Sequence, residues 1–156
     1  MRRFLTLAFS CLASVAAAQS SLDKSVPLNA ERTVITGEYN KAQAQLRNAK
    51  TEAEREAPFK ALAAVAVKAD TLRNYIIKGN NDVISELYRQ RSGTSSRSAT
   101  IKTVTEKLTA ANQALAALPL PTGPKFTAAE VNQIQRVLDT CKTTLDLHKH
   151  ACQNLK

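Results

Sequence analysis

Several residue types and motifs that mark catalytic or nucleotide-binding proteins are rare or absent in this sequence. It has no tryptophan, four glycines and an aromatic content of 4%. It also has no glycine-rich phosphate loop, no G-x-S-x-G and no H-E-x-x-H motif, which hold phosphates, a nucleophilic serine and a catalytic zinc, respectively. So few aromatic rings offer little surface on which nucleic-acid bases stack. We therefore expect no catalytic residue, no cofactor and no nucleic-acid partner.

The only long apolar run in the sequence lies at its N-terminus. Arg2 and Arg3 precede an apolar stretch over residues 4–15, and three alanines follow at 16–18. This order is typical of a signal peptide that is cleaved after Ala18, and the run is shorter than the roughly 20 residues that span a bilayer. We predict that residues 1–18 are a signal peptide and that the protein is secreted or periplasmic.

Cleavage would remove two arginines and no acidic residue, so that 20 basic residues face 13 acidic ones. The mature chain would carry a charge of about +7.

Cysteine is also scarce, because only Cys141 and Cys152 follow the predicted signal peptide. An oxidising compartment favours a disulfide between them. Eleven residues of continuous helix, however, would separate their Cα atoms by about 16 Å, and a disulfide needs them within about 7 Å. Either the helix stops near Thr144–Leu145, or the cysteines pair between chains, or both stay reduced. We assign the internal disulfide tentatively.

The last stretch of the sequence has the strongest helical signal. Thr127 and Glu130 form the T-x-x-E pattern of a capping box, and Phe126 and Val131 are placed to form a hydrophobic staple across it. Apolar or semi-apolar residues then recur at alternating steps of three and four, which draws one stripe along a helix. The stripe is Val131, Ile134, Leu138, Cys141, Leu145, His148 and Cys152.

Three further stretches have the same periodicity, and with the last they predict helices at about 30–56, 59–90, 99–118 and 128–153. Short links and the near absence of strand-forming runs favour an all-α, antiparallel four-helix bundle. We expect one domain over residues 29–156, preceded by an extended segment at 19–28.

The boundaries between these helices rest on local signals. We expect Asn29 to cap the first helix and Pro58 to end or kink it, since proline lacks a backbone N–H. The apolar stripe also changes phase after Ala53, which indicates two helices there. Residues 79–82 (G-N-N-D) weaken the second helix, but the stripe continues beyond them, so we predict one helix through this point.

Basic residues concentrate around one serine-rich loop. Arg89, Arg91, Arg97 and Lys102 lie in a stretch that has no acidic residue between Glu86 and Glu106. Such a patch attracts anionic surfaces in a salt-dependent way. We assign these four residues tentatively to anion binding, with a protein or an anionic glycan as the partner, or an anionic membrane surface. The alternative interpretation is a solvated basic loop that keeps the protein soluble.

A metal site receives little support from the sequence. His148 and Cys152 are four residues apart, a spacing that places two ligands on one helical face. No other helix supplies a cysteine or histidine, and Asp139 and Asp146 are the acidic neighbours in the sequence. We therefore assign no metal ligand.

These features favour a secreted, non-enzymatic helical bundle that binds another macromolecule through its basic loop. The alternative is a carrier of lipid or another apolar ligand, because amphipathic helices can lay their apolar faces on lipid.

Overall fold

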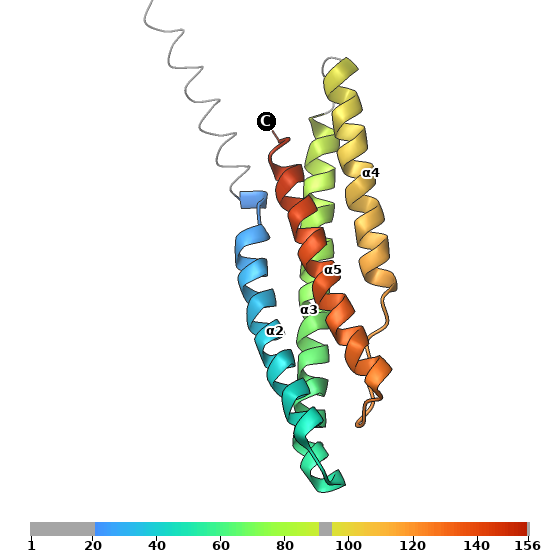
Figure 1. Cartoon of the computed structure of the whole chain (residues 1–156). Helices are drawn as coiled ribbons and strands as arrows, with labels where there is room; N and C mark the ends of the chain where they lie inside the picture. The colour runs from blue at the N-terminus through green and yellow to red at the C-terminus, as the bar shows by residue number, and fades with distance from the viewer. Residues whose placement is uncertain (1–20, 91–94, 156) are drawn as a thin grey trace, which may run out of the picture.

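The computed structural model describes residues 21–90 and 95–155. The predicted signal peptide and Arg91 lie outside these ranges. Within them the chain forms four helices and no strand, namely α2 (Ser25–Asn48), α3 (Glu52–Arg89), α4 (Ser95–Ala117) and α5 (Ala128–Cys152). Successive helices run in opposite directions (Figure 1). The all-α bundle expected from the sequence is confirmed.

Helices α3 and α5 form the centre of the bundle, and α2 and α4 flank them on opposite sides (Figure 1). The apolar core is divided along the bundle axis. A larger cluster contains the buried residues of α2 and the first parts of α3 and α5, for example Tyr39, Leu72 and Leu138. A smaller one joins the end of α3, the start of α4 and the end of α5, for example Leu87, Ile101 and Cys152. Each flanking helix therefore covers mainly one end of the central pair.

Helix α2 begins earlier than expected, at Ser25, so residues 25–28 are helical and not extended. Pro27 is the third residue of the helix, where the backbone N–H has no partner within the helix, and proline is therefore tolerated. The carboxylate of Asp23 accepts a hydrogen bond from the Ser25 backbone N–H at 2.9 Å. Asp23, and not Asn29, thus binds a free N–H group at the start of this helix.

The break between the first two helices was also misplaced, because Pro58 lies inside α3 and is buried. The chain instead leaves helical geometry at Ala49, and Thr51 caps α3 through a capping box with Glu54. The change in phase of the apolar stripe correctly indicated two helices. Proline disfavours the helix but does not forbid it, and the capping box, together with packing, outweighs its cost here.

Helix α5 agrees closely with its prediction. It has the capping box between Thr127 and Glu130, and every residue of its predicted stripe is buried. Helix α3 runs without interruption through residues 79–82. Among the described helices, none combines the length and the apolar character that crossing a membrane requires.

Candidate functional site

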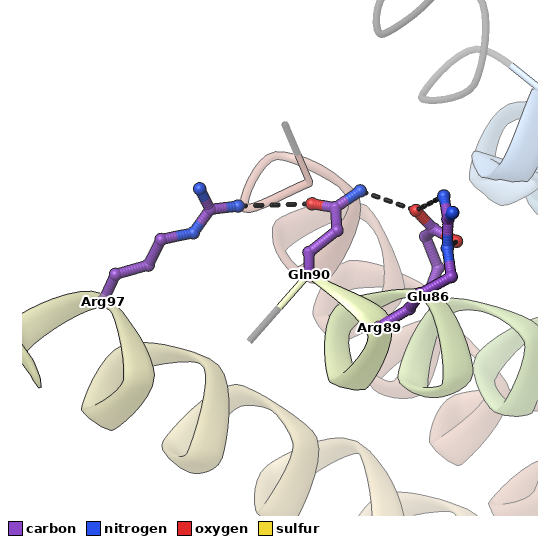
Figure 2. Close-up of polar contacts among 4 residues, drawn as sticks. All are labelled: Glu86, Arg89, Gln90 and Arg97. Atoms are coloured by element: carbon purple, nitrogen blue, oxygen red, sulfur yellow. Dashed lines mark hydrogen bonds and ion pairs between the residues drawn. The ribbon is translucent and has the colours of Figure 1, made fainter. Parts of the chain in front are cut away.

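Three of the four predicted anion-binding residues are described, and all three lie where α3 ends and α4 begins. The Arg89 guanidinium donates to both carboxylate oxygens of Glu86, at 2.8 and 2.7 Å. The Gln90 side-chain amide donates to the same carboxylate at 2.6 Å, and Arg97 donates to the side-chain oxygen Oε1 of Gln90 at 3.2 Å. Figure 2 shows these four side chains as one chain of contacts that joins the two helices.

This basic end, defined by Arg89, Arg97 and Lys102, is only partly neutralised by the acidic residues that flank it in sequence. The Glu86 carboxylate pairs with one guanidinium, that of Arg89, whose hydrogen bonds hold the pKa of Glu86 below its usual value, while Arg97 contacts Gln90 and not this carboxylate. Lys102 lies 3.9 Å from Glu106, a loose pair in which both side chains are largely exposed. Exposed pairs of this kind contribute about 0–1 kcal/mol. The cationic groups can therefore exchange these partners for an external anion at little cost.

A buried polar layer separates the two apolar clusters. The Asn80 side-chain amide of α3 donates to Asn112 Oδ1 of α4 at 2.6 Å, and Asn112 in turn donates to Asn81 Oδ1 at 3.1 Å. On its other side, Asn80 Oδ1 lies 2.8 Å from Nδ1 of His148 on α5. Asn80, Asn112 and His148 are all buried, so the layer connects three helices by hydrogen bonds inside the bundle.

The protonation state of His148 follows from this layer. Since Asn80 donates through its nitrogen to Asn112, its oxygen is the acceptor and His148 Nδ1 carries the proton. In the neutral ring, Nε2 then presents a lone pair, to which the Lys24 backbone N–H donates at 3.2 Å. Burial lowers the pKa of His148, which favours the neutral ring. The imidazole thus faces the segment before α2 with an acceptor nitrogen.

Two further groups lie beside that nitrogen. Sγ of Cys152 is 3.6 Å from Nε2, and the Leu22 carbonyl oxygen is 3.2 Å from it. The Asp23 carboxylate also approaches, with ligand atoms of Asp23, His148 and Cys152 all within 4.8 Å of one another. We refer to these three residues as the Asp–His–Cys cluster.

The tentatively assigned disulfide is not present in the structure. Cys141 and Cys152 are both free and buried, and α5 continues through Thr144–Leu145 to Cys152, so the helix itself holds the two sulfur atoms apart. Burial raises the pKa of each thiol to about 12. Both are therefore protonated and shielded from solvent in this conformation.

Sequence reasoning missed the asparagines of the polar layer and the contribution of Asp23. Asn80 lies between Ile76 and Val83 at steps of four and three, and Asn112 lies between Leu108 and Leu115 at the same steps. Those steps are the signal of a core position, even though the residue is polar. Asp23 had no comparable signal, because only the fold brings it beside α5. The acidic residues that lie nearer to His148 and Cys152 in sequence, Asp139 and Asp146, are both exposed.

A shallow groove of about 340 Å³ lies between α4 and α5. Its walls are mainly the methyl and methylene groups of α4 side chains, including Val104 and Leu108, together with Leu147 of α5. Lys107 and the exposed His150 lie at the same groove.

No protein-family model, no curated protein sequence and no solved structure matches this chain.

Proposed function

We propose that this protein is exported and acts, without catalysis, as a helical-bundle binding protein that holds an anionic partner at its basic end. The observation that carries the proposal is the contact chain of Figure 2, in which Arg89 pairs with Glu86 and Arg97 is linked to the same carboxylate through Gln90, where α3 meets α4. The signal-peptide pattern at residues 1–18 supports export.

The exposure of the basic end favours a large anionic partner. The Arg89 side chain remains 77% exposed although it pairs with Glu86, and Tyr88 beside it is 51% exposed. Guanidinium groups bind carboxylate and sulfate oxygens through paired hydrogen bonds. An acidic protein face or a sulfated glycan offers many such oxygens in a row. We therefore place the partner in one of these two classes.

Salt-dependent retention tests the proposal. The parent protein, the chain from Gln19 onward, is applied to a heparin column and to an immobilised acidic protein. It is compared with a variant in which glutamine replaces all four basic residues together, namely Arg89, Arg91, Arg97 and Lys102. A control variant replaces Arg47, Lys50, Arg55 and Lys60, four exposed cationic residues near the α2–α3 turn at the other end of the bundle. We expect the first variant to elute at clearly lower salt and the control to elute close to the parent. Equal shifts for the two variants would show that net charge alone governs retention.

Glu86→Gln provides a test of opposite sign. This substitution removes the carboxylate that pairs with Arg89 but keeps an amide oxygen that can accept from its guanidinium. If the basic end binds the anion, the variant elutes at higher salt than the parent. An unchanged or lower elution salt contradicts the assignment of the site.

The groove between α4 and α5 favours a second candidate function, a carrier of lipid or another apolar ligand. Its walls are largely apolar, and Lys107 could contact a lipid headgroup. Flotation with anionic liposomes, accompanied by a change in circular dichroism, would support the carrier. Retention on heparin without flotation would support binding at the basic end.

A further inference from the structure

The Asp–His–Cys cluster lies at the opposite side of the polar layer from Asn112, and it shares no residue with the basic end. Cys152 and His148 come from the last two turns of α5, and Asp23 comes from the segment just before α2. A carboxylate, an imidazole and a thiol are the three ligand types that zinc uses most often in proteins. We propose that the cluster binds one Zn²⁺ ion, or a similar borderline-soft divalent cation, and thereby fastens the segment before α2 to the end of α5.

The separation of the two α5 ligands fits a tetrahedral site. Bond lengths of about 2.3 Å to sulfur and about 2.0 Å to nitrogen, at a tetrahedral angle, place the two ligand atoms about 3.5 Å apart. The observed distance from Cys152 Sγ to His148 Nε2 is 3.6 Å. The histidine and the cysteine are thus already at the spacing of two corners of a zinc tetrahedron, and Asp23, within 4.8 Å of both, supplies the third corner.

The surroundings of His148 have the features of a metal-ligand shell. Ligating histidines almost always donate their second ring N–H to an oxygen, which fixes the tautomer and the ring orientation. Here His148 Nδ1 donates to Asn80 Oδ1 at 2.8 Å, and Asn80 is itself fixed by Asn112. The lone pair of Nε2 therefore faces the cluster.

The Leu22 carbonyl oxygen adds another electron-rich group to the cluster. In the neutral ring the lone pair of Nε2 and the Leu22 carbonyl oxygen lie 3.2 Å apart with no proton between them, and the Asp23 carboxylate is beside them. Lys24 and Ser25 donate hydrogen bonds to His148 Nε2 and Asp23, and a cation at this partly buried place would be attracted by all three electron-rich groups. A metal ion on Nε2 would replace the hydrogen bond from the Lys24 N–H and leave Leu22 O as a candidate fourth ligand.

The Asp23 carboxylate is held in place by Ser25. Its Oδ1 accepts from the Ser25 backbone N–H and from the Ser25 hydroxyl, which holds the carboxyl group at the start of α2. An oxygen of this carboxylate lies within 4.8 Å of the ligand atoms of His148 and Cys152 and serves as the third ligand in the proposal. On binding, the Cys152 thiol gives its proton to solvent and the metal takes its place on sulfur.

Metal binding is measured with the full exported protein, stripped with a chelator and kept reduced. Isothermal titration with ZnCl₂ is expected to give one ion per chain, and CoCl₂ is expected to give the thiolate-to-cobalt charge-transfer band together with the intense visible bands of tetrahedral cobalt. Cys152→Ser should abolish the charge-transfer band, and Asp23→Asn should lower the affinity at least about tenfold. Circular dichroism shows whether each variant still folds.

Two matched controls locate the site. Cys141→Ser removes the other buried thiol of α5, and His150→Gln removes the other histidine of the same helix turn. Both should keep the stoichiometry and the charge-transfer band. If wild-type protein binds no stoichiometric zinc, if its cobalt form lacks the thiolate band, or if a control variant loses binding as Cys152→Ser does, the proposal is wrong. Because none of these residues belongs to the basic end, the outcome is independent of retention on heparin.

Discussion

Asn80 on α3 donates a hydrogen bond to Asn112 on α4 at 2.6 Å, and both side chains are buried where the neighbouring turns are apolar. Each asparagine replaces an apolar residue in the stripe of its helix, so the two amides meet only when α3 and α4 have one relative register. A slip of one turn would leave both amides buried without partners, at the cost of their desolvation. The pair therefore disfavours other alignments of α4, whose own stripe is short.

The first prediction concerns this pair. Asn112→Ala should lower the free energy of unfolding by about 1–3 kcal/mol, because it leaves the Asn80 amide buried without its acceptor. A double-mutant cycle with Asn80→Ala should give a coupling of at least about 0.5 kcal/mol, measured by urea unfolding. Asn132→Ala, an exposed position on α5, is the control and should change stability by less than about 0.5 kcal/mol. Additive effects of the two core substitutions would contradict the register role.

The apolar stripes were predictable from the sequence because the same physics sets their spacing and their burial. The residues of the α5 stripe are buried as expected, including the semi-apolar His148. Helix ends were less accessible, since a weak local preference competes with packing. Pro58 suggested a boundary, but burial of its ring against the core and the cap at Thr51 keep α3 continuous. Of the Asp–His–Cys cluster, the spacing of His148 and Cys152 was visible in the sequence, but Asp23 was not predictable, because only the fold brings it from the other end of the chain.

The second prediction tests the cap that the sequence reasoning overlooked. Thr51→Ala removes the hydroxyl that accepts from the Glu54 N–H at 3.2 Å and should lower the free energy of unfolding by about 1 kcal/mol. Thr127→Ala, which breaks the corresponding contact at the start of α5, should have a similar effect. Thr143→Ala, at an exposed position inside α5, should change stability by less than about 0.5 kcal/mol. Urea unfolding of the three variants checks these values, and a neutral Thr51→Ala would show that the capping box adds nothing.

The third prediction concerns the state of the cysteines. Because Cys141 and Cys152 are free, buried and held apart by a continuous helix, a thiol reagent should modify neither in the native, chelator-treated protein and both after denaturation. The intact mass without reductant should equal that of the reduced chain. A mass lower by two hydrogens would reveal an internal bond and a helix that ends before Cys152, and a doubled mass would reveal pairing between chains.

The last prediction follows from the same burial at Cys141, which raises the pKa of its thiol from 9.0 to about 12. The folded protein therefore keeps this proton above about pH 9, where the unfolded chain loses it. The free energy of unfolding should fall as the pH rises from about 9 toward 12, by up to about 1.4 kcal/mol per pH unit from this one group. In the chelator-treated protein Cys152, whose pKa is also raised to about 12, adds a second contribution of the same sign. Cys141→Ala should make the alkaline slope shallower, whatever its cost at neutral pH.

Val137→Ala, which truncates another buried side chain of α5 without removing a titrating group, should lower stability equally at each pH and leave the slope unchanged. Urea unfolding under reducing conditions between about pH 8 and 11 measures both, and parallel curves for wild type and Cys141→Ala would show that the thiol is not protected as the structure places it.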